Sequence, residues 1–215
     1  QAVVARAMPL GLDFHTLRDK RTDGGKLWWG ERKMASLEQY RVLCSLRQSA
    51  AVSVRARPVQ DKVLAPFRIA EEPIREGFFH SHGIPTRRAV FKALNESGLV
   101  ELVFGKRRRD MWAEMARHAF VVSPVGHGLD AHRTWEAVSL GCIVLVESSP
   151  LDSLYTDNEL PVAIMPDLAA WEALNSSKLA ELLEKFAPWT EPEHLVPRLD
   201  TDFWFKPPDP HALRH

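Results

Sequence analysis

The sequence predicts an α/β domain in which helices cover both faces of a parallel sheet. From Asp61 onward, short apolar runs alternate with helix-like segments. Strands buried on both faces read as near-continuous apolar runs, and helices usually form the crossovers between parallel strands. The chain has 215 residues, of which 45% are hydrophobic, which is enough for one or at most two globular domains. Its 28 basic and 28 acidic residues cancel, so its charge gives no reason to expect nucleic acid as a partner.

The first 57 residues are expected to hold a connector and one helix. Residues 21–30, "RTDGGKLWWG", read as a Gly-containing connector. Residues 34–50, "MASLEQYRVLCSLRQSA", predict an amphipathic helix with Ser36 as a possible N-cap. Spacings of three and four place five side chains on one face of this helix: Leu37, Tyr40, Leu43, Cys44 and Arg47.

Residues 58–170 carry the alternating pattern. Strands are expected at residues 62–70, 99–105, 120–124, 142–148 and 160–167, with helices at 85–97, 109–119 and 130–140. Pro85 suits the first turn of its helix, and Gly141 is expected to end the helix before it. Residues 171–215 add one or two helices and then a Pro-rich tail without a regular period, which we expect to lie on the surface. No apolar run is long enough to cross a bilayer.

The loop "VGHGLD" after the strand at 120–124 is the main candidate for a ligand site. Ligands of open α/β sheets collect beyond the carboxyl ends of the strands. Gly126 and Gly128 allow a ligand to approach the backbone closely, and the N-terminus of the following helix suits an anion such as a diphosphate. The donor-site candidates in and around this loop are Ser123, Gly126, His127, Gly128, Asp130, His132, Arg133 and Glu136.

Each of these residues also has a purely structural interpretation. Arg133 and Glu136 have the spacing of an intrahelical ion pair. Asp130 is a possible N-cap, and His127 a plain loop residue. A single G-x-G before a helix is weak evidence, because such loops serve many ligands and some serve none.

Two further basic segments bear on the same question. Arg87 and Arg88 open the helix after the first strand of the sheet, where their guanidinium groups match phosphate oxygens. Cations there oppose the helix dipole unless an anion is present. The run at residues 106–109, "KRRR", is expected to be a solvated turn, with a phosphate or partner contact as the alternative.

Residues 123–155 resemble the signature of exostosin-like glycosyltransferases, the inverting family forty-seven type. The stretch reads "SPVGHGLDAHRTWEAVSLGCIVLVESSPLDSLY". It departs from the family pattern at His127, Ala131 and Val144, where Asn, Cys and Pro are more usual. The positions in register are Ser123, Pro124, Gly126, Gly128, Asp130, Arg133, Trp135, Glu136, Gly141, Ile143, Val146, Ser149, Leu151, Asp152, Leu154 and Tyr155.

The resemblance implies a GT-B-type glycosyltransferase, of which residues 58–170 form the Rossmann-like lobe that binds a nucleotide-sugar, UDP-sugar being the expected donor. It implies transfer to a hydroxyl of a glycan or glycoprotein with inversion and without an obligatory metal or cofactor. Glu136 would hold the ribose, while Arg133 with Arg87 or Arg88 would balance the diphosphate. A Golgi location follows by resemblance if the full-length protein carries a membrane anchor.

In the architecture that the resemblance implies, the catalytic base belongs to the other lobe. Residues 1–57 would hold the end of an upstream lobe, where Asp13 and His15 are the candidates for the base, with a structured turn as the alternative. A non-catalytic nucleotide-sugar-binding module, or an incomplete fragment of such an enzyme, is the alternative function. A nicotinamide-dependent oxidoreductase is disfavoured, because no G-x-G-x-x-G follows the first strand of the sheet.

Overall fold

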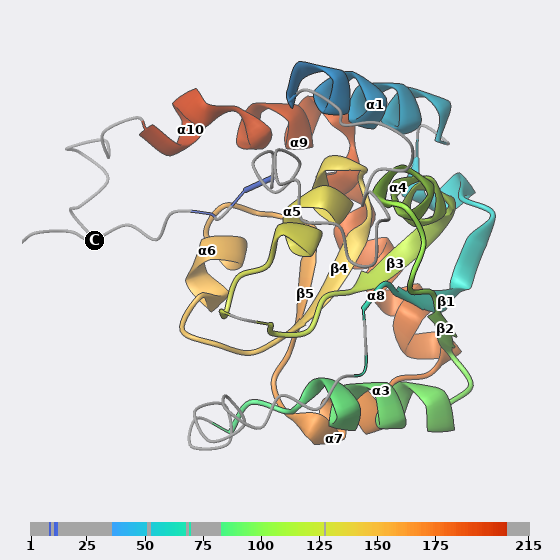
Figure 1. Ribbon diagram of the computed structural model, residues 1–215. Helices are drawn as coiled ribbons and strands as arrows, with labels where there is room; N and C mark the ends of the chain where they lie inside the picture. The colour runs from blue at the N-terminus through green and yellow to red at the C-terminus, as the bar shows by residue number, and fades with distance from the viewer. Residues whose placement is uncertain are drawn as a thin grey trace, which may run out of the picture.

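A five-stranded parallel sheet forms the centre of the molecule (Figure 1). The computed structural model describes residues 9, 11–12, 36–50, 53–67, 69, 83–126 and 128–205. The strands are β1 (Val59–Ala65), β2 (Val100–Leu102), β3 (His118–Val122), β4 (Ile143–Glu147) and β5 (Val162–Met165). Their order is β2-β1-β3-β4-β5, and every neighbouring pair is parallel. The predicted parallel α/β sheet is confirmed, and it has a doubly wound, Rossmann-like arrangement.

Helices cover both faces of the sheet (Figure 1). One layer holds α1 (Ser36–Ser49), α4 (Arg108–Arg117), α5 (His132–Ser139), α6 (Asp152–Thr156), α9 (Pro192–Leu199) and α10 (Thr201–Phe205). The other holds α3 (Arg87–Glu96), α7 (Leu168–Glu172) and α8 (Ser176–Thr190). A short 3-10 helix, η2 (Val54–Ala56), precedes β1.

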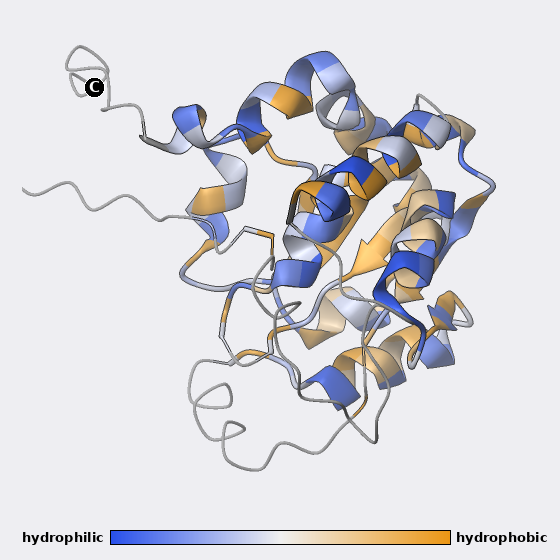
Figure 2. Cartoon of the chain, turned by 45° about the horizontal axis from the view of Figure 1, so that its top comes forward, coloured by the Kyte–Doolittle hydropathy of each residue, from blue (hydrophilic) through white to orange (hydrophobic). Residues whose placement is uncertain are grey.

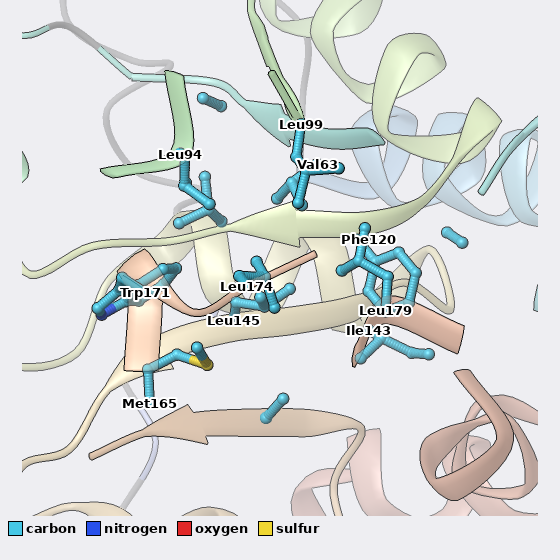
Figure 3. Packing of buried hydrophobic residues seen from close by; sticks show 14 of the residues in the cluster. Val63, Leu94, Leu99, Phe120, Ile143, Leu145, Met165, Trp171, Leu174 and Leu179 are labelled. Carbon is cyan, nitrogen blue, oxygen red and sulfur yellow. The ribbon is translucent and has the colours of Figure 1, made fainter. Parts of the chain in front are cut away.

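Alternate strand residues separate the core into two parts. Leu64, Val121 and Val144 face the layer that contains α4 and α5. Val63, Phe120 and Ile143 face the opposite layer. In Figure 3, Phe120 and Ile143 lie beside Leu179, and Val63 lies beside Leu99. Because a strand turns successive side chains to opposite faces, apolar residues in succession give a strand two buried faces. Figure 2 shows the result, with apolar strands enclosed by helices that turn hydrophilic residues outward.

The structure corrects three details of the sequence analysis. On α1, the side chains of Leu37 and Tyr40 are 58% and 55% exposed, whereas Gln39 and Leu43 are buried. The strand expected at residues 99–105 shortens to β2, three residues long. Residues 192–205 form α9 and α10 instead of an irregular tail, because Pro192 occupies the permitted first turn of α9.

Two arginines bind helix carbonyl groups at the amino-terminal ends of the strands, a region called here the amino edge of the sheet. The Arg57 guanidinium, 4% exposed, donates from Nη1 to the carbonyl oxygens of His118 at 2.7 Å and Met115 at 3.3 Å, and from Nη2 to that of Leu140. These carbonyls lie at the C-terminal ends of α4 and α5, where a positive charge is favourable. Arg47 of α1 binds the carbonyls of Ser139 and Thr190 in the same way.

Gly141 ends α5 beside these arginines, as the sequence predicts. Its φ of +73° lies in the left-handed region that favours glycine. A Cβ there would also meet Arg47 Nη1 at 2.7 Å, so a larger residue would displace the arginine. None of the helices in the described part of the chain is long and apolar enough to cross a bilayer.

Candidate functional site

The winding direction of the sheet changes between β1 and β3. β1 leads to α3 in one helix layer, whereas β3 leads to α5 in the other (Figure 1). The N-termini of these two helices therefore flank the carboxyl ends of β1 and β3. Such a change of direction is the place where open α/β sheets bind their ligands.

Arg133 lies in the first turn of α5. Its Nε donates to the carbonyl oxygen of Pro66, directly after β1, at 3.2 Å, and its guanidinium lies 5.8 Å from the centre of the Phe67 ring. Burial, followed by the nearby charge of Arg87, lowers the pKa of Arg133 to about 10, which still leaves it charged at neutral pH. Its Nη1 is inaccessible to solvent and has no hydrogen-bond partner among the described residues. Buried donors without a partner are rare in proteins, so Nη1 is a candidate contact for a ligand that binds here.

Arg87 approaches from the other helix layer. It is the first residue of α3, whose N-cap Thr86 accepts a hydrogen bond from the Ala89 N–H. The Arg87 Nε donates to the carbonyl oxygen of Val125, in the glycine loop, at 2.8 Å. Arg88, its neighbour, is exposed. The two arginines that the sequence could not separate thus have different surroundings.

Glu147 completes the group, although the sequence analysis did not select it. It is the last residue of β4 and is 2% exposed. Its Oε2 accepts a hydrogen bond from the Val125 N–H at 3.2 Å, while its Oε1 is buried and has no partner in the part of the chain that the structure describes. Burial raises the pKa of Glu147 to about 7, against the opposing effects of backbone hydrogen bonds and of Arg87 and Arg133. An acidic residue at the carboxyl end of an apolar strand is the signal that identifies it.

Val125 therefore links the two charged groups. Glu147 binds its N–H and Arg87 binds its carbonyl oxygen. Together with the contact of Arg133 to Pro66, these bonds fix three charged side chains at the ends of β1, β3 and β4. The group combines two cations with a carboxyl that titrates near neutral pH.

Other predicted residues hold the loop in place. Ser123 Oγ and Thr134 Oγ1 are 2.9 Å apart and buried, which ties the end of β3 to α5. Asp130 is not the N-cap, a position that Ala131 occupies without a side-chain bond. Instead, both Asp130 oxygens accept from the Trp135 indole N–H at 2.9 Å. Asp130 thus orients the first turns of α5.

His132 and the two glycines lie along the same segment. His132 Nδ1 is 2.7 Å from the carbonyl oxygen of Gly11, so Nδ1 carries the proton in this contact. The Gly126 N–H donates to the Gly128 carbonyl oxygen at 3.1 Å, which closes the loop on itself. Asp13, His15 and His127 lie outside the described residues.

Glu136 is buried one turn into α5, where it pairs with Arg108 rather than with Arg133. Arg108 comes from the basic run at residues 106–109 and lies 5.5 Å from the centre of the Trp112 ring. The expectation of a fully solvated turn is therefore wrong for this residue, although Lys106, Arg107 and Arg109 are exposed. The run contributes an inward-facing cation that fixes the Glu136 carboxylate.

A comparison with protein-family models found no match, and a search of curated proteins found no similar sequence. Among the residues that the structure describes, no group of three or more His, Cys, Asp or Glu side chains is arranged to hold a metal ion. Arg87 and Arg133 are the groups of this site that suit an anion, because guanidinium groups match phosphate oxygens.

Gly126→Ala is expected to weaken anion binding by about tenfold with little change in stability. A Cβ at this position would lie 2.6 Å from Arg87 Nη2, so the guanidinium must move. One displaced charge-assisted hydrogen bond is worth about 1.5–3 kcal/mol. Gly128→Ala is the matched control, because among the described residues its Cβ would meet only the Asp130 carbonyl oxygen, at an ordinary 3.7 Å. Titration with pyrophosphate, followed by NMR, measures both; equal affinities would contradict the assigned position of Arg87.

Proposed function

We propose that this chain is the donor-binding lobe of an exostosin-like, GT-B-type glycosyltransferase that binds a nucleotide-sugar, with UDP-sugar the expected donor. The observation that supports this best is the position of Arg87 and Arg133, which flank the switch point of a parallel sheet from opposite helix layers. The Nη1 of Arg133, which has no partner among the described residues, would donate a hydrogen bond to a ligand oxygen. Paired guanidinium groups suit a diphosphate, which carries several oxygens to bind.

The other residues of the site have roles that fit this proposal. Glu136, with Oε1 fixed by Arg108, would present Oε2 to a ribose hydroxyl. Ser123, Gly126, Gly128 and Asp130 would shape the loop around the diphosphate. Arg88, being exposed, would contribute a weaker, longer-range attraction.

The proposed reaction is a single displacement with inversion. A general base takes the proton of the acceptor hydroxyl, whose oxygen forms a bond to the anomeric carbon of the sugar. The bond from that carbon to the phosphate oxygen breaks, and the nucleoside diphosphate leaves with the electron pair. Arg87 and Arg133 would stabilise the negative charge that develops on the departing diphosphate. Asp13 and His15 remain the proposed candidates for the base, and a glycan or glycoprotein hydroxyl the proposed acceptor.

Calorimetric titration of the whole chain with UDP, GDP and several UDP-sugars tests this function. The titrations are made without divalent metal and again with it. We expect saturable binding of one nucleoside diphosphate without metal, since two guanidinium groups neutralise part of its charge. No binding of any nucleotide, in a chain shown to be folded by circular dichroism, would overturn the proposal. Binding without transfer or hydrolysis of the sugar would identify a non-catalytic nucleotide-sugar-binding module instead.

A further inference from the structure

We propose that Glu147 accepts a hydrogen bond from a hydroxyl group of the ligand's sugar, so that the site binds a glycosyl phosphate in preference to a phosphate without a sugar. This inference rests on the proposed function, because it takes Arg87 and Arg133 as the groups that bind the phosphate. It goes further because it assigns a sugar contact to Glu147, which lies outside the glycine loop.

The position of Glu147 supports this role. Glu147 is the last residue of β4 and lies beside the loop that follows β3. Its Oε2 accepts a hydrogen bond from the Val125 N–H at 3.2 Å. The same Val125 residue accepts the hydrogen bond of Arg87, so Glu147 and Arg87 lie on either side of one loop residue. Oε1 of Glu147 is buried and has no partner. Buried polar atoms without a partner are rare in proteins, and such an acceptor at a ligand site calls for a ligand donor.

The chemistry of the surroundings selects the kind of donor. A carboxylate repels phosphate oxygens, so the Glu147 Oε1 does not suit the anionic part of the ligand. The charges of Arg87 and Arg133 act at the same place and disfavour a cationic donor such as an amine. A neutral hydroxyl group satisfies both conditions. In a glycosyl phosphate, the sugar carries such hydroxyls next to the phosphate.

Protonation of Glu147 would change what it recognises. The groups that act on it include its own backbone N–H, the Val125 N–H, Arg87 from α3, Arg133 from α5 and Tyr155 from α6. Burial raises the pKa of Glu147 to about 7 despite the two cations. Above this pH the ionised carboxyl accepts a hydroxyl hydrogen bond. Below it the protonated carboxyl is a donor, and the preference for a sugar should fall.

The test compares sugar phosphates with methyl phosphate, which has no hydroxyl groups. The probes are the 1-phosphates of glucose, galactose and N-acetylglucosamine, titrated into the whole chain at pH 8 and followed by NMR. We expect at least one sugar phosphate to bind about tenfold more tightly than methyl phosphate, because a hydrogen bond to a charged acceptor is worth at least that factor. At pH 6 the preference should shrink. Equal binding of all probes at pH 8 would overturn the inference.

Glu147→Gln isolates the carboxylate. The Gln oxygen can still accept from Val125, but an NH₂ donor then replaces the unpartnered acceptor. Removing the carboxylate charge should strengthen methyl phosphate binding if it changes it at all, because a carboxylate repels phosphate oxygens, and the tenfold preference for the sugar phosphate should disappear. Glu181→Gln, on the exposed surface of α8, is the matched control and should keep the preference. A Glu147→Gln protein that retains it would overturn the inference.

Titration with UDP shows whether the hydroxyl that Glu147 binds belongs to the ribose or to the transferred sugar. It also distinguishes a failure of the proposed function from a failure of the Glu147 inference. A loss of UDP affinity in Glu147→Gln as large as the loss for the sugar phosphate would assign the contact to ribose and overturn the sugar assignment. Absence of UDP binding to wild type would count against the proposed function alone, since the sugar phosphates still test Glu147. If Glu147→Gln does not fold, as judged by circular dichroism, the wild-type comparison at pH 8 and pH 6 decides.

Discussion

Replacing Arg57 by methionine is expected to lower the free energy of unfolding by about 3–5 kcal/mol. The Arg57 guanidinium donates to the carbonyl oxygens of Met115, His118 and Leu140, at the ends of α4 and α5. Methionine fills much of the same volume but donates no hydrogen bond. Carbonyl groups that water cannot reach then lose their partner, and each costs about 1–3 kcal/mol. Urea denaturation followed by tryptophan fluorescence measures the loss.

Arg55→Met is the control for Arg57→Met. Arg55 lies two residues earlier, at the surface, and its guanidinium pairs with the exposed carboxylate of Glu184. Exposed ion pairs contribute little to stability, so its urea midpoint should stay close to that of wild type. Similar midpoints for the two variants would show that Arg57 does not secure the helix ends.

Arg133→Met is expected to lower the affinity for a nucleoside diphosphate by about 100-fold, the loss of two charge-assisted hydrogen bonds at about 1.5 kcal/mol each. The guanidinium offers its unpartnered Nη1 to the ligand, and methionine preserves the packing of the stem over Phe67. The free energy of unfolding should change by less than about 1 kcal/mol, because losing the bond to Pro66 is offset by removing a buried charge. Calorimetry and urea denaturation of the same protein measure the two effects.

Arg88→Met separates a specific contact from a general loss of positive charge. It removes the same charge from the exposed neighbour of Arg87. A reduction in affinity of less than about threefold is expected, since exposed charges are screened by salt. If Arg88→Met weakens binding as much as Arg133→Met does, binding depends on net charge and not on the geometry around Arg133.

The sheet could be predicted from the sequence because its central strands, β3 and β4, are buried along their whole length. A short apolar run between two helices, such as residues 143–146, fits a buried strand better than any other structure. The helix faces were harder. On α1, spacings of three and four fit more than one face, and the polar side chain of Gln39 is buried where Tyr40 was expected. Hydrophobicity alone does not show which face of a short helix meets the core.

The site was predicted in part for a related reason. Arg87, Arg133 and the glycine loop follow from the rule that ligands collect beyond the carboxyl ends of parallel strands. Arg108 was missed because charged runs usually face water, although Trp112 four residues later marks the same helix face as buried. Glu147 was treated as the end of an apolar strand. Its environment depends on the Val125 N–H and on two arginines from distant segments, which sequence spacing does not reveal.

Charged side chains make different contacts at the amino and at the carboxyl ends of the parallel strands. At the amino edge, Arg57 and Arg47 satisfy the carbonyl groups at helix ends. At the carboxyl ends, Arg133 and Glu147 each keep a buried atom without a partner in the described part of the chain, as Arg57 does at Nε on the amino side. Substitutions of Arg133 or Glu147 for another ligand leave the arginine contacts at the C-terminal ends of the helices untouched. Ligand binding and stability can therefore be changed separately, by substituting residues at the carboxyl ends or at the amino ends of the strands.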